Sequence, residues 1–113
     1  SIVNCASILG HVGQAATASY TAAKGGVVNM TRALSLEYAS QGIRVNAVCP
    51  GYINTPLLDQ LDDATRKHLV SLHPLGRLGE SHEVANAVVF LASDEASFVT
   101  GANLLVDGGY TAQ

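Results

Sequence analysis

Tyr20 and Lys24 are the two side chains whose types and spacing most directly indicate catalysis. They lie four residues apart, so on a helix they share one face about one turn apart. A phenol normally ionises at about pH 10, too high for a base at neutral pH, but an adjacent ammonium group favours the phenolate. The pair therefore predicts proton transfer, and a helical tyrosine beside a solvated lysine is the structural alternative.

A serine and a loop could complete a site around this pair. Ser7 ends an apolar run, and ligands bind at the carboxyl ends of strands in open α/β sheets. The next apolar run ends at Pro50 and Gly51, so its loop should open on the same edge. Gly51 permits close backbone approach to a flat ligand, and Thr55 could hydrogen-bond there or cap a following helix. We expect the Ser7 hydroxyl to hold a substrate carbonyl beside the Tyr20 phenol.

The elements that must position these side chains alternate along the chain. Short apolar runs predict buried strands over residues 1–7, 44–50 and 104–106. Helical patterns cover residues 19–40, 56–72 and 81–92, the second with a polar interruption at Asp62 and Asp63. Gly42 should stop the first helix, and Ser81 should cap the last. Long crossovers between continuously apolar strands predict a parallel sheet with helices on its faces.

This pattern predicts an α/β fold that forms part of a doubly wound parallel sheet. Three strands with covering helices are few for such a sheet, so we expect residues 1–113 to belong to a larger one. The helix over residues 19–40 carries apolar residues around much of its circumference. It should therefore pack both on the sheet and against a partner subunit.

Composition excludes several classes of protein. The 113 residues are 48% hydrophobic and 13% charged, with a net charge of −3, which is too apolar for a disordered chain. No apolar run approaches the roughly 18–20 residues of a membrane helix, so we expect no membrane partner. The six Lys and Arg residues are scattered, which argues against nucleic-acid binding.

Cysteine and histidine usage completes this assessment. Cys5 and Cys49 lie in predicted buried strands, so we expect two reduced core thiols in a cytoplasmic protein. Of the four histidines, His68, His73 and His82 have no metal-ligand spacing with cysteine or acidic residues, and no metal site is expected.

Taken together, the motifs resemble the classical short-chain dehydrogenase/reductase family, and most closely its bacterial secondary-alcohol dehydrogenases. The matching segments are residues 4–7, 20–26, 44–51, 53–55, 74–77 and 106–109, with a step of 13 residues from Ser7 to Tyr20. Each motif is weak alone, but their occurrence in order over nearly the whole chain is highly specific.

The resemblance implies a role for each matching residue. The serine at Ser7 orients the substrate oxygen, and the tyrosine at Tyr20 passes a proton to or from it. The lysine at Lys24 hydrogen-bonds the nicotinamide ribose and favours the ionised tyrosine. The cofactor-binding residues implied for NAD or NADP are Tyr20, Lys24, Pro50, Gly51, Ile53 and Thr55. Candidate residues of the substrate pocket are His11, Leu57, Leu58 and Leu61, which fall in the loop before Tyr20 and in the family's substrate lid.

The implied function is hydride exchange between a nicotinamide cofactor and a secondary alcohol or ketone, in a homotetramer. The family's glycine-rich pyrophosphate turn has no counterpart before a helix here. The resemblance therefore implies that residues 1–113 are the C-terminal catalytic part of a single NAD(P)-binding domain. They would form the C-terminal half of a doubly wound parallel sheet of Rossmann type, inactive without the N-terminal half.

Three alternatives remain open. A 3-oxoacyl-carrier-protein reductase would have a similar C-terminal half, and a basic patch for its acidic carrier would favour it. A sugar epimerase of the extended branch shares the Tyr-x-x-x-Lys motif but usually lacks the Asp-Gly-Gly ending. An inactive fragment that serves only as an assembly module would bind neither NAD nor NADP.

Overall fold

The strand β2 (Val45–Pro50) is the centre of the fold in the computed structural model, which describes residues 1–113. Its residues from Val45 to Cys49 are at most 1% exposed, as expected for a strand covered on both faces. It pairs in parallel with β1 (Ile2–Cys5) on one side and β5 (Asn103–Val106) on the other. The predicted parallel sheet of three strands is confirmed.

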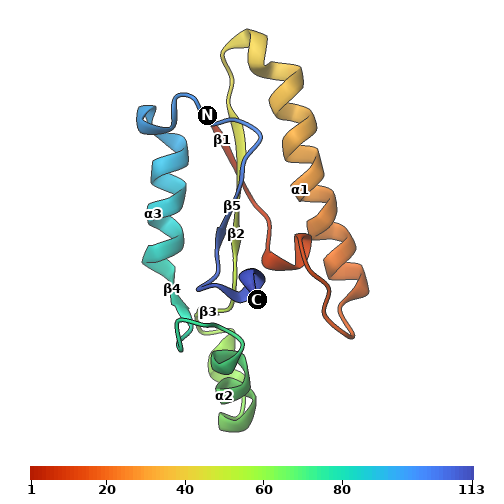
Figure 1. Ribbon diagram of the computed structural model, residues 1–113, viewed down its shortest axis with the longest axis vertical. Helices are drawn as coiled ribbons and strands as arrows, with labels where there is room; N and C mark the ends of the chain where they lie inside the picture. Colours follow the sequence, from red (N-terminus) through yellow and green to blue (C-terminus); the bar gives the residue numbers. More distant parts are fainter.

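Two helices cover the opposite faces of this sheet. Figure 1 shows α1 (Ala18–Tyr38) on one side of the strands and α3 (Ser81–Ala92) on the other. The helix α1 buries mainly small and β-branched side chains, those of Val28, Thr31 and Ser35, against the sheet. A short 3₁₀ turn follows it and ends at Gly42 in the left-handed conformation, with φ of 73°. The predicted glycine stop is therefore confirmed.

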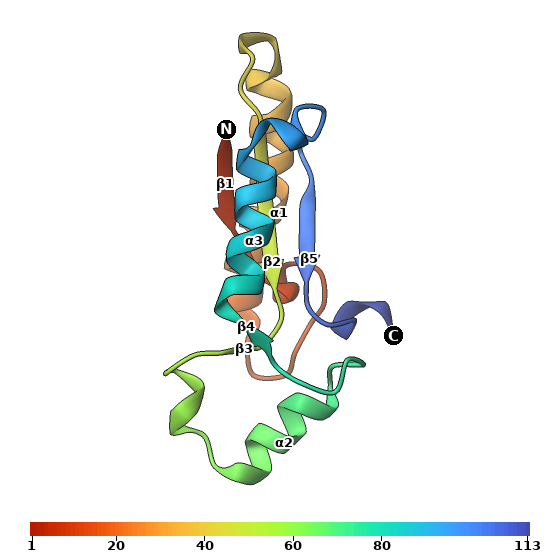
Figure 2. The same cartoon turned by 90° about the vertical axis from the view of Figure 1, so that its left-hand side faces the viewer.

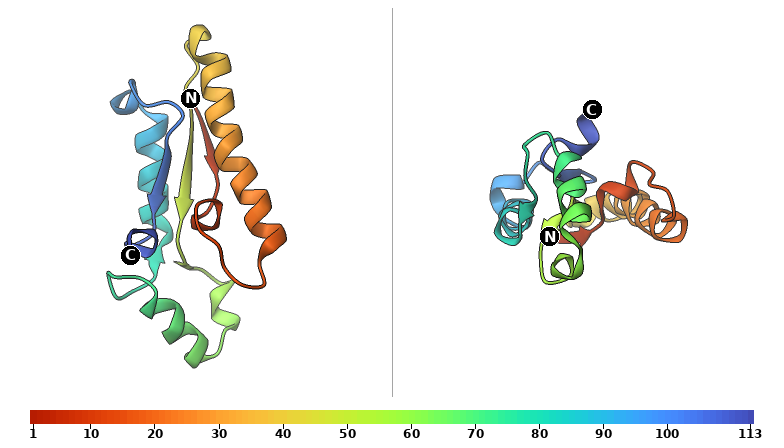
Figure 3. Two further views of the ribbon diagram at one scale, coloured as in Figure 1. Left: turned by 45° about the vertical axis from the view of Figure 1, so that its right-hand side comes forward. Right: turned by 90° about the horizontal axis from the view of Figure 1, so that it is seen from below.

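All three strands run in the same direction, so their carboxyl ends meet at one edge of the sheet. The start of α1 lies at the same end of the molecule (Figure 3). The helix α2 (Asp63–Ser71) lies beyond this edge (Figure 2). Two residues of β3 (Ile53–Asn54) pair in parallel with two of β4 (Gly79–Glu80) beside it. Strands this short leave no periodic signal, and the sequence did not predict them.

Three local predictions were wrong. The segment 56–72 is not one helix: the Asp62 carboxylate accepts a hydrogen bond from the Thr65 N–H at 2.7 Å and starts α2 there. Thr55 therefore caps no helix. The N-cap of α3 is Glu80 rather than Ser81, and the Glu83 carboxylate accepts a hydrogen bond from its N–H at 2.7 Å. Each of these helices starts where a side chain accepts a hydrogen bond from a free backbone N–H, and the pattern of apolar residues does not show where such a bond forms.

Cys5 was expected to be buried, but it is exposed, whereas Cys49 is buried as expected. The strand β1 pairs only with β2 and forms an edge of the sheet, which leaves its last residue uncovered. Both cysteines are free thiols. None of the helices has the length and the hydropathy that crossing a membrane requires.

The side chain of Asn46 ties β2 to the segment that leads into β5. It is fully buried, its Nδ2 donates to the Val99 carbonyl at 2.8 Å, and its Oδ1 accepts from the Ala102 N–H at 2.9 Å. Since a buried backbone group without a partner is costly, this amide stabilises the packing of residues 99–102 against β2.

We predict that Asn46→Ala lowers the free energy of unfolding of the full-length protein by about 2–4 kcal/mol. The change leaves the Ala102 N–H without a partner in the interior, and it removes one of the two donors to the Val99 carbonyl, which keeps only the Arg44 Nη1 at 3.2 Å. Urea denaturation measures the effect, with Asn86→Ala on the exposed surface of α3 as the matched control. Equal stability of the two variants would contradict this role of Asn46.

Candidate active site

A pocket of about 380 Å³ opens at the carboxyl edge of the sheet. Residues following β1, the first turn of α1 and the loop following β2 form its walls. The lining residues are Ser7, Ile8, Leu9, Gln14, Thr17, Tyr20, Gly51, Tyr52, Ile53, Thr55, Leu57 and Leu58. None of them carries a formal charge. The structure thus brings together Ser7, Tyr20 and most of the predicted cofactor loop.

The position of Ser7 is fixed by the 3₁₀ turn that follows it. Its Oγ accepts a hydrogen bond from the Leu9 N–H at 3.1 Å, and the residue is 8% exposed. The turn lies directly against α1, because a Cβ added to Gly10 would meet Val28 Cγ2 at 2.5 Å and the Lys24 carbonyl oxygen at 2.8 Å. Only glycine allows this approach, which sets Ser7 beside the first turns of α1.

Tyr20 and Lys24 lie one turn apart at the start of α1, as their spacing predicts. The Lys24 Nζ donates to the Cys5 carbonyl at 2.9 Å and lies 5.7 Å from the centroid of the Tyr20 ring. This hydrogen bond fastens the start of α1 to the end of β1. Tyr20 is 48% exposed and lines the pocket, whereas Lys24 is not one of the lining residues.

The loop after β2 reaches the pocket because Gly51 passes very close to its neighbours. Its N–H donates to the Val106 carbonyl at 3.1 Å. A Cβ at this position would meet His73 Nε2 at 2.9 Å and Asp107 Cα at 3.0 Å. Pro50 ends β2 outside the pocket, while the side chains of Ile53 and Thr55 line it.

The four predicted substrate-pocket residues divide into two pairs. Leu57 and Leu58 line the pocket, but His11 and Leu61 do not. The His11 ring turns instead toward β2, where its Nε2 lies 3.3 Å from Cys49 Sγ. Burial raises the pKa of the Cys49 thiol, so this contact involves a protonated sulfur.

Five lining residues were not predicted: Ile8, Leu9, Gln14, Thr17 and Tyr52. The one sequence feature that could have indicated them is their position, either between Ser7 and Tyr20 or directly after Gly51. Sequence alone does not say which side chains of a loop turn inward, because that depends on how two distant loops meet.

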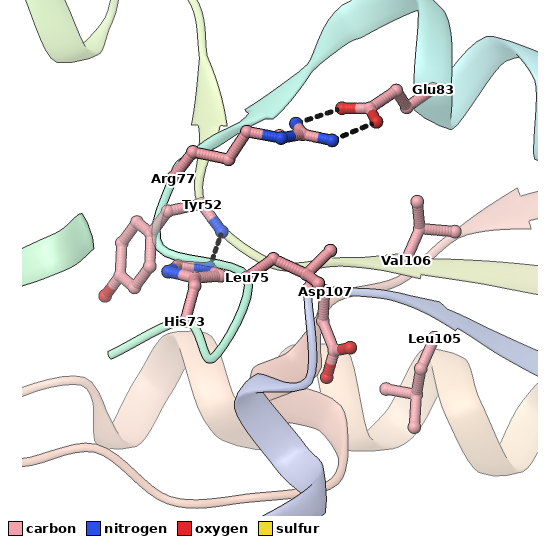
Figure 4. A pocket seen from close by; sticks show the side chains of 10 residues that line it. Tyr52, His73, Leu75, Arg77, Glu83, Leu105, Val106 and Asp107 are labelled. Atoms are coloured by element: carbon pink, nitrogen blue, oxygen red, sulfur yellow. Dashed lines mark hydrogen bonds and ion pairs between the residues drawn. The ribbon is translucent and has the colours of Figure 1, made fainter. Parts of the chain in front are cut away.

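A second cavity of about 260 Å³ is also lined by Tyr52, and two of its charged side chains, Arg77 and Glu83, are paired with each other (Figure 4). Arg77 makes two hydrogen bonds to the Glu83 carboxylate, at 2.7 and 2.8 Å. The guanidinium holds the pKa of Glu83 at about 2, and the carboxylate raises that of Arg77.

Asp107, on the other wall of this cavity, is also satisfied within the chain. Burial raises its pKa, but hydrogen bonds from Thr111 and from the Gly109 N–H outweigh burial and leave the pKa below its ordinary value. The cavity therefore offers a ligand no free charge, and its groups support the loops around the first pocket.

Over nearly its whole length, the chain is similar to known dehydrogenases and reductases. A family model described as enoyl-(acyl carrier protein) reductase matches residues 1–111. Cis-4-hydroxycyclohexanecarboxylate dehydrogenase of Sinomonas cyclohexanicum is 58% identical over 112 residues, which are 99% of this chain and 45% of that protein. Cyclohexanol dehydrogenase of Acinetobacter sp. (strain SE19) is 53% identical over 113 residues, 100% of this chain and 44% of that protein.

A 3-oxoacyl-(acyl-carrier-protein) reductase of Thermotoga maritima is 47% identical over 109 residues, 96% of this chain and 44% of that protein. A crystal structure of an Agrobacterium tumefaciens protein, assigned as a 2-deoxy-d-gluconate 3-dehydrogenase and holding NADP, has a TM-score of 0.94 at 47% identity. The match covers 98% of this chain and 46% of that one. The chain thus spans less than half the length of each of these proteins.

We predict that Gly51→Ala destabilises the full-length protein by about 1–3 kcal/mol, because the added Cβ overpacks the contact with His73 and Asp107. Gly13→Ala is the matched control, since a Cβ there would meet no atom within 4 Å. Thermal or urea unfolding reports the difference. If Gly51→Ala were as stable as Gly13→Ala, the close approach of the loop to these residues would be wrong.

Proposed function

The chain belongs to the short-chain dehydrogenase/reductase family, and we propose that the protein containing it is an NAD- or NADP-dependent oxidoreductase. It interconverts a secondary alcohol and a ketone by hydride transfer, with Ser7, Tyr20 and Lys24 as its acid–base residues. Residues 1–113 supply the catalytic part of its Rossmann-type domain, and the adenine and pyrophosphate of the cofactor are bound by residues outside this chain.

One observation carries the proposal: three hydroxyl groups with unused hydrogen-bonding capacity line the same pocket. The hydroxyls of Tyr20 and Thr55 make no hydrogen bond within the chain, and both residues line the pocket. Ser7 Oγ accepts from the Leu9 N–H, which leaves its hydrogen free to be donated. Polar groups kept free beside apolar walls are typical of a site that orients a small molecule.

Ser7, Tyr20 and Lys24 each have a separate role in alcohol oxidation. Ser7 donates its hydrogen to the substrate oxygen and fixes its position. The ionised Tyr20 takes the hydroxyl proton as the carbonyl forms, and in the reverse direction the phenol returns it. The Lys24 ammonium, 5.7 Å from the Tyr20 ring centroid, favours the ionised phenol by its charge.

The cofactor loop fits a nicotinamide by the chemistry of its side chains. Ile53 offers an apolar contact for a flat ring, and the free Thr55 hydroxyl suits a carboxamide. A bound nicotinamide supplies the acceptor or donor of the hydride. The bound NADP in the Agrobacterium tumefaciens structure supports a dinucleotide, and the choice between NAD and NADP is left to residues outside this chain.

The substrate proposed for this site is a cyclic secondary alcohol. Besides Ile53 of the cofactor loop, four aliphatic side chains line the pocket, those of Ile8, Leu9, Leu57 and Leu58. Two of the relatives are named for six-membered ring alcohols. An aliphatic ring would bury its faces against these side chains while its hydroxyl reached Ser7 and Tyr20.

A second candidate is a 3-oxoacyl-carrier-protein reductase, which the 47% identity to the Thermotoga maritima enzyme favours. The pocket has no charged lining residue to attract an acidic carrier protein. Reduction of a 3-oxoacyl thioester on its carrier, faster than reduction of cyclohexanone, would select this candidate.

The oligomer proposed is a homotetramer. On α1, Met30 is 46% and Leu36 81% exposed, and on α3 Val89 is 65% exposed. One edge of β5 is unpaired. Exposed apolar side chains on both covering helices and an open strand edge are features that association with further copies would bury.

We predict that Tyr20→Phe lowers kcat of the full-length protein for a cyclic secondary alcohol by about 100-fold or more, with its fold unchanged. Only the hydroxyl that exchanges the proton is lost. Steady-state kinetics and circular dichroism check the two statements. Tyr38→Phe, at the other end of α1, is the control, and a Tyr20→Phe variant as active as this control would refute the assignment.

We predict that Lys24→Met reduces kcat at neutral pH by about tenfold and moves the pH–rate profile to higher pH. The change removes the charge that favours the phenolate and the hydrogen bond to the Cys5 carbonyl. Rates measured from pH 6 to pH 11 test this, and Lys67→Met on α2 is the control. An unaltered profile would show that Lys24 does not act on Tyr20.

A further inference from the structure

Tyr52 lies between the two cavities and lines both of them. Its ring packs among those of His73 and Tyr110, with centroid distances of 6.0 and 6.2 Å. Its hydroxyl donates to Gln14 Oε1 at 2.6 Å, across the pocket from the loop that precedes α1. One side chain therefore connects the support behind the pocket to the pocket itself.

The backbone of Tyr52 is held by His73, which is 3% exposed. The Tyr52 N–H donates to His73 Nε2 at 3.2 Å, as Figure 4 shows, and His73 Nδ1 lies 2.8 Å from the Leu69 carbonyl oxygen. A carbonyl can only accept and an amide N–H can only donate, so Nδ1 carries the hydrogen and Nε2 is the acceptor. His73 thus joins the end of α2 to the loop after β2 in one defined arrangement.

In the first pocket, Gln14 and Tyr52 can each make one more hydrogen bond to a ligand, Gln14 as a donor and Tyr52 as an acceptor. The amide nitrogen of Gln14 makes no hydrogen bond within the chain, because only its Oε1 is engaged. The Tyr52 hydroxyl donates its hydrogen to that oxygen, so its own oxygen can still accept. A single hydroxyl group could accept from the Gln14 amide and donate to Tyr52, which a carbonyl or a carboxylate could not do.

We propose that Gln14 and Tyr52 form a second recognition point that takes an uncharged hydroxyl substituent on a ring substrate, away from the carbon oxidised at Ser7 and Tyr20. The substrate class is then a cyclic diol; this inference rests on the proposed function. A carboxylate in the same place would meet no positive charge, since none of the lining residues is charged, and burying it would be costly.

The test compares kcat/KM of the full-length protein for 1,4-cyclohexanediol and for cyclohexanol. The diol has two equivalent hydroxyls that can react, so its kcat/KM would be twice that of cyclohexanol even if the second hydroxyl were not bound. We expect a preference of about tenfold or more for the wild-type protein, as one or two neutral hydrogen bonds provide. Gln14→Leu and Tyr52→Phe should each bring the preference down to about twofold, whatever their effect on the absolute rates.

Tyr110→Phe is the matched control, because it removes a hydroxyl that makes no hydrogen bond within the chain beside the same ring, and it should keep the wild-type preference. His73→Leu tests the positioning role: the preference should fall with it, and His73→Gln, whose Oε1 can accept from the Tyr52 N–H, should restore part of it. A structural role alone would alter stability but not the ratio between the two alcohols.

Three results would overturn the inference. Normal oxidation of cyclohexanol with a preference of twofold or less, or an undiminished preference in Gln14→Leu, would remove the second recognition point and leave the proposed function standing. Oxidation of neither alcohol by the wild-type protein would overturn both.

Discussion

The parallel pairing of β2 with both of its neighbours is the constraint on which the site depends. Because β2 is buried on both faces and bonded along both edges, its register with β1 and β5 is fixed, with Cys5 opposite Val48 and Pro50 opposite Val106. That register brings the residues after the two strands β1 and β2, Ser7 and Gly51, to one edge. The start of α1 is then fastened to the same edge by the bond from Lys24 to the Cys5 carbonyl.

The sequence predicted the parts of this structure that depend on periodic burial or on a single obligatory residue type. The apolar runs located three strands, Gly42 ended the helical segment that α1 begins, and the spacing of Tyr20 and Lys24 placed them one turn apart on α1. Capping side chains decided what patterning could not: Asp62 starts α2 seven residues after Thr55. Cys5 was misjudged because its burial depends on a neighbouring strand rather than on its own residue type. Gln14 and Tyr52 meet across 38 residues of sequence, and no local rule predicts such a contact.

The pocket lined by Ser7 and Tyr20 has no charged residue, whereas the second cavity contains the ion pair of Arg77 and Glu83. Because the pKa of Glu83 is lowered from 4.5 to about 2, the contribution of its pair with Arg77 to stability is complete above pH 4.5 and is lost only as the pH falls toward 2. The ion pair of Arg77 and Glu83 in the second cavity is therefore intact at neutral and alkaline pH. With uncharged walls, the recognition of a substrate rests on hydroxyl and amide groups and on aliphatic contact.

The most direct test of the account is a crystal structure of the full-length protein with oxidised cofactor and cyclohexanone, a combination that cannot react. The account predicts that the ketone oxygen lies about 2.6–3.2 Å from both Ser7 Oγ and the Tyr20 hydroxyl oxygen. It also predicts that the nicotinamide contacts Ile53 and Thr55 and that the ring lies against Leu57 and Leu58. A ketone bound elsewhere, or one whose oxygen is out of reach of Tyr20, would contradict the assignment of this pocket as the active site.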